Sequence, residues 1–238
     1  MRHENMLLAS LPDGERARLA PCLETVTLGL SEVLIRLDEP IQYVWFPYDA
    51  VTSTLQPLED GETVESGLMG LEGLVGIQLW LRMDTTPSTT LVQVPGTALR
   101  MSRNDFIREV MNVPESPLNT LLARYVHAFL VLTSQTAACN RMHQVDQRLC
   151  RWLRMVYNRV PERTELPLRQ DFVASMLGVQ RPTVSTAASI LQRAGYIEYS
   201  RGRMRILDPT GLARGACECY ELMEAQFDRI LAVPWRPE

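Results

Sequence analysis

The chain contains no lysine, so its 24 cationic side chains are all arginine. Compositional bias of the source genome explains this better than a design for guanidinium chemistry. The chain also lacks an apolar run of the ~20 residues that a membrane span requires. Its polar start, MRHENM, does not have the pattern of a signal peptide. These absences predict a cytoplasmic protein that does not interact with a membrane.

Cysteine is sparse, with five residues in a chain of 238, and no CxxC pair occurs. Structural zinc sites commonly place their ligands in such pairs. The sequence therefore predicts no metal site and no cofactor. Cys217 and Cys219 are expected to be half-buried thiols on the last helix.

Arrangements typical of catalysis are missing as well. No Ser-His-Asp, Cys-His or paired-carboxylate set occurs at spacings that the inferred fold would bring together, and no glycine-rich loop could cradle a phosphate. We expect that the protein is not an enzyme.

Negative charge dominates overall, with a formal net charge of −4, but the two halves differ. Residues 1–115 carry 8 Arg and 17 Asp or Glu, a net charge of −9, whereas residues 116–238 carry 16 Arg and 11 Asp or Glu, a net charge of +5. The basic half is therefore the one expected to meet a polyanion such as DNA.

Residues 166–208 have the pattern of two short helices joined by a turn. The first should end at Gly178, where a positive φ is usually needed. The second has Pro182 in its first turn, where the missing N–H costs nothing. This layout is a helix-turn-helix, whose second helix can enter the major groove of DNA. The expected buried faces are Phe172, Val173, Met176 and Leu177, and then Val184, Ala187, Ala188 and Leu191.

A β-hairpin is predicted directly after the second helix. Two short β-type runs, 196–199 and 204–207, flank the turn Ser200-Arg201-Gly202-Arg203, in which glycine supplies positive φ. A hairpin in this position is the wing of a winged helix. Arg201 and Arg203 at its tip are placed to touch phosphate.

The pattern AxxLGVxRxTVSxAxxxLxxAGYI, followed by RGRxxILD, resembles the C-terminal domain of the Crp–Fnr family of bacterial transcription regulators. The resemblance extends more weakly over the whole chain. It implies an α+β fold with three parts: an antiparallel, jelly-roll-like β-roll at 1–115, a long dimerisation helix and hinge at 116–143, and a winged helix-turn-helix at 144–238. It also implies a homodimer that binds double-stranded DNA and, if it activates transcription, RNA polymerase. The dense N-terminal cysteine set of iron–sulfur members is absent, since only Cys22 lies there.

The first half of the chain favours a β-roll independently, because short alternating segments between residues 24 and 64 are divided by turn residues. It resembles cyclic-nucleotide-binding domains, in which a Glu binds the ribose and an Arg the cyclic phosphate. Here Ile77 and Thr86 occupy those positions. A partly buried anion needs a cation or backbone donors, so the usual cyclic-nucleotide mode is expected to be absent. Another effector in the same cavity, or no effector, stays open. The candidate pocket residues are Glu72, Gln78, Arg82, Thr85, Thr86 and Thr89.

Beyond Pro117 the apolar pattern takes the alternating 4,3 spacing of a coiled-coil seam. This resembles the dimerisation helix of the family and predicts a homodimer. The seam consists of Leu118, Leu122, Tyr125, Phe129, Leu132 and Thr136.

The resemblance also assigns the DNA-contacting residues. Arg181 matches the first recognition arginine, whereas Pro182 and Thr186 replace a Glu and a second Arg, so the half-site should differ from the usual one in the family. We expect an inverted repeat read by 181–189. The candidate contacts are Gln180, Arg181, Thr183, Ser185, Thr186 and Ser189, with Arg169, Gln170, Arg201 and Arg203 on the DNA backbone.

Two alternatives to this function stay open. One is a cyclic-nucleotide-responsive regulator with an altered pocket. The other is a winged-helix module whose basic face binds a protein partner.

Overall fold

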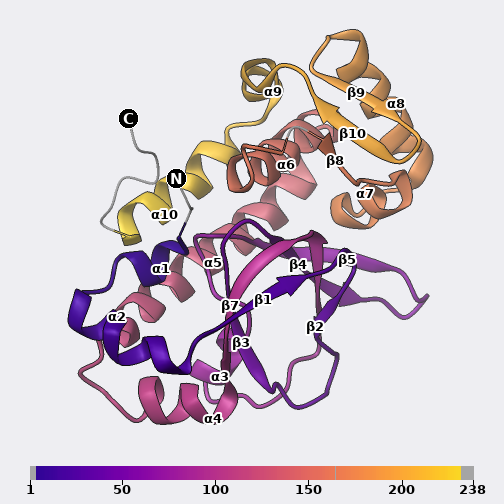
Figure 1. Ribbon diagram of the computed structural model, residues 1–238. Coiled ribbons are helices and arrows are strands. Elements are labelled where there is room, and N and C mark those ends of the chain that lie inside the picture. The colour runs from indigo at the N-terminus through magenta and orange to yellow at the C-terminus, as the bar shows by residue number, and fades with distance from the viewer. Residues whose placement is uncertain (1–3, 164, 232–238) are drawn as a thin grey trace. The chain divides into compact units, whose positions relative to one another are not determined.

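The computed structural model describes residues 4–163 and 165–231 and has the α+β composition predicted from the sequence (Figure 1). The described residues divide into two compact units. The first contains 4–55, 67–131 and 224–231, and the second contains 56–66, 132–163 and 165–223. Among the described residues, no helix is long and apolar enough to cross a bilayer.

The first unit begins with three short helical segments. These are α1 (Met6–Ala9), α2 (Asp13–Leu19) and the 3₁₀ turn η1 (Ala20–Cys22). The side chain of Asn5 caps α1 by accepting from the N–H of Leu8, which satisfies a free donor of the first turn. Leu7 and Leu19 are fully buried and fix these segments to the core.

A roll of two antiparallel sheets follows. One sheet has the order β1-β7-β3, and the other has the order β2-β6-β4-β5. Short alternating segments of the sequence, divided by turn residues, predicted such strands, and the register pairs Val44 with Met101 and Ser53 with Leu91. The strands are β1 (Glu24–Leu28), β2 (Val33–Ile35), β3 (Tyr43–Pro47), β4 (Val51–Pro57), β5 (Thr63–Met69), β6 (Thr89–Val94) and β7 (Gly96–Ser102), with the short helix α3 (Ile77–Trp80) between β5 and β6.

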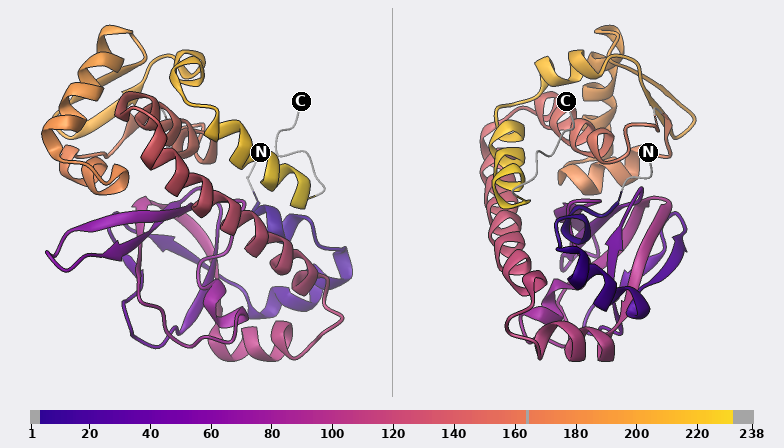
Figure 2. Two further views of the ribbon diagram at one scale, coloured as in Figure 1. Left: turned by 180° about the vertical axis from the view of Figure 1, so that it is seen from behind. Right: turned by 60° about the vertical axis from the view of Figure 1, so that its left-hand side comes forward.

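The roll leads into helices. α4 (Arg103–Phe106) and the π-helical turn η2 (Ile107–Met111) precede the long helix α5 (Pro117–Met142), which is continuous in Figure 2. α5 packs closely on the roll: the Tyr125 hydroxyl donates to the carbonyl of Leu74 at 3.2 Å, and a Cβ on Gly73 would lie 2.6 Å from that hydroxyl oxygen. Only glycine therefore allows this approach.

The second unit contains a winged helix. Its helices are α6 (Val145–Arg159), α7 (Gln170–Leu177), α8 (Arg181–Arg193) and α9 (Pro209–Gly215), and α10 (Cys219–Leu231) begins in this unit. A three-stranded sheet has the order β8-β10-β9, from β8 (Glu165–Leu166), β9 (Ile197–Ser200) and β10 (Arg203–Ile206). Leu149, Trp152 and Leu153 on α6 are at most 1% exposed and belong to its buried core.

Candidate nucleic-acid interface

The turn between α7 and α8 has the geometry expected from the sequence. Gly178 ends α7 in the left-handed region, with φ of 60°. Gln180 is the N-cap residue of α8, and proline follows within its first turn. Val173 and Leu177 of α7, and Val184 and Leu191 of α8, are each at most 2% exposed. Burial of these faces leaves the opposite side of α8 in solvent.

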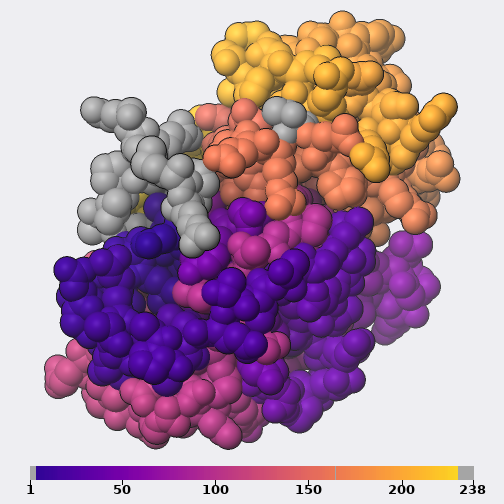
Figure 3. All heavy atoms as spheres, viewed as in Figure 1, coloured from indigo at the N-terminus to yellow at the C-terminus, as the bar shows by residue number. Residues whose placement is uncertain are grey.

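The hairpin β9–β10 turns through only two residues, Arg201 and Gly202. Both have positive φ, 49° and 77°, which defines the type I′ turn that suits the twist of a two-residue hairpin. Ser200 pairs with Arg203 beside the turn. The turn places the exposed Arg201 at the tip of the wing. The atoms of this part of the chain are coloured orange in Figure 3.

A groove of about 550 Å³ lies between the start of α7, the start of α8 and the wing. The amide oxygen of Gln170 accepts from the Ser185 hydroxyl at 2.8 Å and from Nε of Arg181 at 3.5 Å, so Gln170 ties the two helices together. The groove is lined by Arg169, Gln170, Asp171, Arg181, Tyr199, Arg201 and Gly202. The structure thus brings together four residues predicted to contact DNA and adds three others.

The groove contains one carboxylate among its cations. Nη2 of Arg169 lies 2.9 Å from a carboxylate oxygen of Asp171, and both side chains are more than half exposed. Burial acts to raise the pKa of Asp171, but hydrogen bonds from its own backbone N–H and from Arg169 prevail and lower it. Burial raises the pKa of Tyr199, whose hydroxyl donates to the carbonyl of Leu168 at 2.9 Å. The tyrosine therefore stays neutral at physiological pH.

The solvent side of α8 carries hydroxyl groups. Thr183, Thr186 and Ser189 are exposed, and Ser185 is half-buried. The hydroxyls of Thr186 and Ser189 each donate to a carbonyl one turn earlier, as with Ser189 and the carbonyl of Ser185 at 2.8 Å. These hydroxyls keep their lone pairs available to accept hydrogen bonds from base edges or to contact thymine methyl groups.

Arg203, on the other side of the turn from Ser200, forms an ion pair. Its Nη1 lies 2.6 Å from a carboxylate oxygen of Glu165 on the neighbouring strand, and both side chains are at least half exposed. Exposed pairs of this kind contribute only ~0–1 kcal/mol. The pair can therefore open at little cost when a phosphate approaches.

The predicted effector residues lie in the first unit. Thr86 is buried and its hydroxyl lies 2.9 Å from that of Ser88. Glu72 is buried and accepts from the N–H of Gly70 at 3.2 Å, whereas Arg82 is exposed on the turn after α3, with φ of 66°. Gln78, Thr85 and Thr89 are half-buried. Position 77 carries a buried isoleucine in place of an acidic residue.

Buried polar residues of the roll that sequence reasoning missed lie on β4 and β6. The Ser53 hydroxyl donates to the Gln93 amide oxygen at 2.7 Å, and the hydroxyls of Thr54 and Thr90 lie 3.0 Å apart. All four are at most 7% exposed. The sequence contains a signal for these residues, because small hydroxyl residues occupy neighbouring positions of the strands, where a buried strand would be expected to carry apolar residues.

The predicted dimer seam faces inward over its first part. Leu118, Leu122 and Tyr125 are at most 1% exposed within the single chain, where Tyr125 packs on the roll, and Leu132 is also buried. Phe129 and Thr136 are half-buried, with the Phe129 ring 2.6 Å from the place of a Cβ on Gly67. From Leu118 to Phe129 the 4,3 repeat therefore reflects packing of α5 on its own roll.

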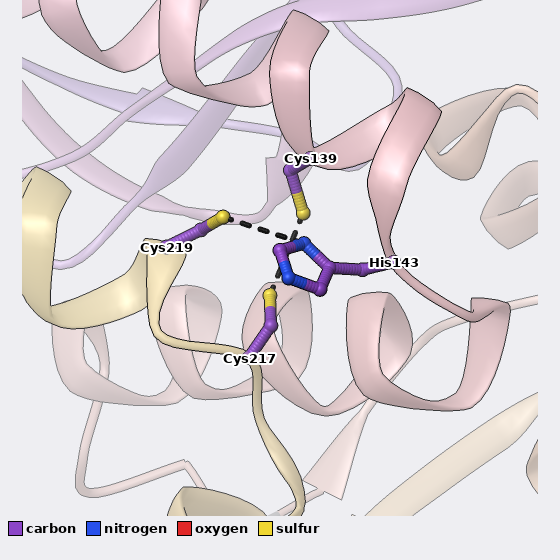
Figure 4. Close-up of side chains that lie close together, drawn as sticks. All are labelled: Cys139, His143, Cys217 and Cys219. Carbon is purple, nitrogen blue, oxygen red and sulfur yellow. Dashed lines mark hydrogen bonds between the residues drawn. The ribbon is translucent and has the colours of Figure 1, made fainter.

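Four potential metal ligands that sequence reasoning did not combine meet in the second unit. They are Cys139, His143, Cys217 and Cys219, and their ligand atoms all lie within 4.8 Å of one another (Figure 4). Cys217 and Cys219 were expected to be half-buried on the last helix, but both are buried and Cys217 precedes α10. Their neighbours in space are 74 or more positions away in sequence, so no local motif shows the group.

Comparison with known proteins gives the class of the fold. A model of the Crp-like helix-turn-helix domain matches residues 147–214. The structure of FixK2 from Bradyrhizobium japonicum is similar, with a TM-score of 0.67 and 14% identity over 82% of this chain and 98% of that one. CLP from Xanthomonas campestris, described as a c-di-GMP responsive global regulator, has a TM-score of 0.63 and 16% identity over 82% and 99%.

A third similar structure is TTHA1359 from Thermus thermophilus, a transcriptional regulator of the CRP/FNR family, with a TM-score of 0.61 and 18% identity over 81% and 98% of the chains. No curated protein sequence matches the chain. The fold of the second unit is that of a winged helix-turn-helix, whose second helix can enter the major groove of DNA. The chain carries a Crp-like helix-turn-helix domain on the fold of Crp/Fnr transcription regulators, and the predicted resemblance and fold class are confirmed.

Proposed function

We propose that the protein is a homodimeric transcription regulator that reads an inverted-repeat DNA site with α8. The observation that carries this proposal is the groove that joins Arg169, Gln170, Arg181 and Arg201 beside the exposed side of α8. Three guanidinium groups from two helices and the wing provide the positive surface that phosphates require. The net charge of +5 on residues 116–238 supports the same assignment.

The exposed side of α8 supplies the base-reading groups. Arg181, at the start of the helix, can make a bidentate contact to guanine, and Thr186 one turn later offers a hydroxyl and a methyl group to thymine. Gln180, Thr183, Ser185 and Ser189 complete this surface, while Arg169, Gln170, Arg201 and Arg203 hold the DNA backbone. Half-sites should lie about one helical turn (~34 Å) apart.

The dimer contact lies on the outer side of α5. The inward seam is already buried in the chain, but a second 4,3 repeat runs about 140° round the helix from it. Its members are all exposed, and Leu130 is 58% exposed. This outer seam consists of Ala123, His127, Leu130, Ser134 and Ala137. A helix that packs on its own domain with one face can meet a second copy with the other.

Residues 1–115 act as a sensory β-roll for an effector that is not cyclic AMP. The support is chemical: position 77 offers a buried isoleucine and position 86 a buried threonine bonded to Ser88, so neither holds a ribose hydroxyl or neutralises a cyclic phosphate. The similar regulator CLP is described as responsive to c-di-GMP, a different nucleotide. Glu72, Gln78, Arg82, Thr85, Thr86 and Thr89 remain the candidate contacts. RNA polymerase is a further partner if the protein activates transcription.

Selection of bound sequences from random duplex DNA by the purified full-length protein tests the central proposal. The expected result is a palindromic consensus whose binding weakens steeply with salt, because phosphate contacts release counterions. No enrichment, or binding that salt leaves unchanged, would contradict the DNA-binding function and favour a protein partner for the basic face. Enrichment of a single half-site would instead contradict the dimer.

A further inference from the structure

Three thiols and one imidazole converge at the junction of α5 and α6. Cys139 lies in the last turn of α5, and His143 follows four residues later, so both point from the same side of the helix. Cys217 and Cys219 come from the segment between α9 and the first residue of α10 (Figure 4). The three cysteines are buried, while the His143 side chain keeps 18% of its surface exposed. A solvent ion can therefore reach the group from the histidine side.

The separations fit a single tetrahedral ion. Sγ of Cys139 lies 3.5 Å from Sγ of Cys217, and Sγ of Cys219 lies 3.5 Å from Nδ1 of His143. Zn–S bonds of ~2.3 Å and Zn–N bonds of ~2.0 Å in tetrahedral geometry would separate such ligand atoms by about 3.5–3.8 Å. An iron–sulfur cluster distributes its ligands over two or more irons, which requires wider spacing than the 4.8 Å limit found here.

Outer contacts orient two of the ligands. Nε2 of His143 lies 3.2 Å from a carboxylate oxygen of Glu218, which leaves Nδ1 directed toward the sulfurs. A carboxylate behind a ligating histidine is the usual support of a zinc-bound imidazole. The Gln135 amide donates to Sγ of Cys219 at 3.1 Å, and such a donor would stabilise a thiolate ligand at this position.

Charge at the site also favours thiolates. Arg148 and Arg151 on α6 are at most 5% exposed, and Nε of each is buried with no hydrogen-bond partner among the described residues. Nη1 of Arg151 lies 3.2 Å from the thioether sulfur of Met155 and 3.7 Å from that of Met223. Three thiolates and one divalent cation leave a charge of −1, which these guanidiniums can neutralise.

One cysteine of the second unit, Cys150, lies outside the group, and burial raises its pKa to about 12. Cys150 is therefore an inert thiol in the same unit and a matched control.

We propose that Cys139, His143, Cys217 and Cys219 bind one zinc ion, or a divalent ion of the same thiophilic, tetrahedral class. The ion would join the end of α5 to the segment that follows the winged helix and so fix the break between α5 and α6. This proposal goes beyond the proposed function and does not depend on DNA binding. Zinc binding and DNA binding can therefore fail separately.

Cobalt substitution of the full-length protein tests the site. The protein is purified, reduced, stripped with a chelator and titrated with Co²⁺. We expect one cobalt per chain, with the visible absorption of tetrahedral cobalt and a sulfur-to-cobalt charge-transfer band, and its loss when Zn²⁺ is added. Cys217→Ser and Cys219→Ser should abolish stoichiometric binding, whereas Cys22→Ser and Cys150→Ser should leave it unchanged. Glu218→Gln should weaken zinc binding about 10-fold.

Alkylation of the wild-type protein gives a test that does not rely on folding of the variants. Zinc should protect Cys139, Cys217 and Cys219 together, while the half-buried Cys22 stays reactive in both forms. The proposal is overturned by a cobalt spectrum without sulfur ligation, by unchanged stoichiometry in Cys217→Ser, by the absorption of an iron–sulfur cluster, or by zinc that protects none of these thiols.

Discussion

Nη2 of Arg169 lies 2.9 Å from the carboxylate of Asp171 inside the groove proposed to hold DNA. The pair is exposed on both sides, with 75% and 58% of the two side chains in solvent. A phosphate that binds Arg169 must therefore displace the carboxylate of Asp171 from the guanidinium, or bind against the electrostatic repulsion of that carboxylate. The aspartate reduces the positive potential of the groove, so we expect it to weaken binding to DNA of every sequence.

Asp171→Asn should therefore raise affinity for DNA without changing the preferred sequence. Loss of one exposed carboxylate is worth up to ~1 kcal/mol, or about five-fold in affinity, at low salt. Fluorescence anisotropy with specific and random duplexes measures both. Asp38→Asn, on an exposed turn of the roll, is the control and should leave both unchanged. Equal or weaker binding by Asp171→Asn, with an unaltered melting temperature, would contradict the placement of phosphate at Arg169.

Arg181→Ala should relax specificity rather than lower affinity uniformly. Arg181 is exposed at the first position of α8, and its Nε makes a long 3.5 Å contact to Gln170, so its guanidinium can turn toward a base edge. We expect a loss of ~1–3 kcal/mol on the specific site and of the preference for one guanine per half-site. Arg203→Ala on the wing is the comparison and should weaken all sequences alike. The base-reading role is refuted if Arg181→Ala lowers affinity equally for specific and random DNA.

The winged helix could be predicted because the residues that mark its helix ends and its turn act on the local backbone. Gly178 and Gly202 stand at positions that need a positive φ, and Pro182 stands in the first turn of a helix, where its missing N–H costs nothing. The structure gives the expected left-handed φ of 60° at Gly178 and 77° at Gly202. The orientation of α5 could not be derived in this way. A 4,3 repeat shows that one side of a helix is buried, but not whether a roll or a second helix covers it.

The Cys/His group escaped prediction for a different reason. Cys139 and His143 have the spacing of one helix face, and Cys217 and Cys219 are two residues apart, yet neither pair is a CxxC motif. Only the return of the chain after α9 brings them within 4.8 Å. Ligand sets assembled from segments 74 residues apart need the tertiary fold.

Cyclic AMP should not bind tightly to the roll. Ile77 is buried and apolar, and Thr86 is occupied with Ser88, so a cyclic phosphate would lose its water without gaining a cation. Isothermal calorimetry should show no dissociation constant in the low micromolar range. Tight binding that Thr86→Val abolishes would show that this position does hold the nucleotide and would support the cyclic-nucleotide alternative.

Acid should weaken the first unit in part through Glu15. Its hydrogen bond from Arg18, with Nη2 at 2.9 Å, and another from Ser116 outweigh burial and lower the pKa of this carboxyl. A lowered pKa in the folded state adds stability above the ordinary value of ~4.3 and loses it as pH falls through the folded value. Glu15→Gln should thus cost up to ~1 kcal/mol at pH 7, and the difference should vanish at low pH in urea melts. Glu62→Gln, on an exposed turn, should show no such difference.

The two sides of α5 should respond differently to a new charge. Leu122 is fully buried on the roll, so Leu122→Glu buries a carboxylate without a partner and should destabilise the fold by ~3 kcal/mol or more. Leu130 is 58% exposed in the single chain, so Leu130→Glu should leave the melting temperature of a monomer almost unchanged. In a two-fold dimer, however, the outer seam would bring the two new carboxylates together in an apolar contact, where like charges repel.

We therefore expect Leu130→Glu to be a folded monomer that binds a single half-site weakly and no longer prefers the inverted repeat. Light scattering gives the mass, circular dichroism the fold, and anisotropy with full and half sites the DNA binding. Arg124→Glu, also exposed but beside the outer seam, serves as a matched charge control and should stay dimeric. A dimeric Leu130→Glu together with a monomeric, folded Leu122→Glu would reverse the assignment. The inward seam would then be the one that leaves the roll to meet a partner, and α5 would have to detach from Gly73 for the dimer to form.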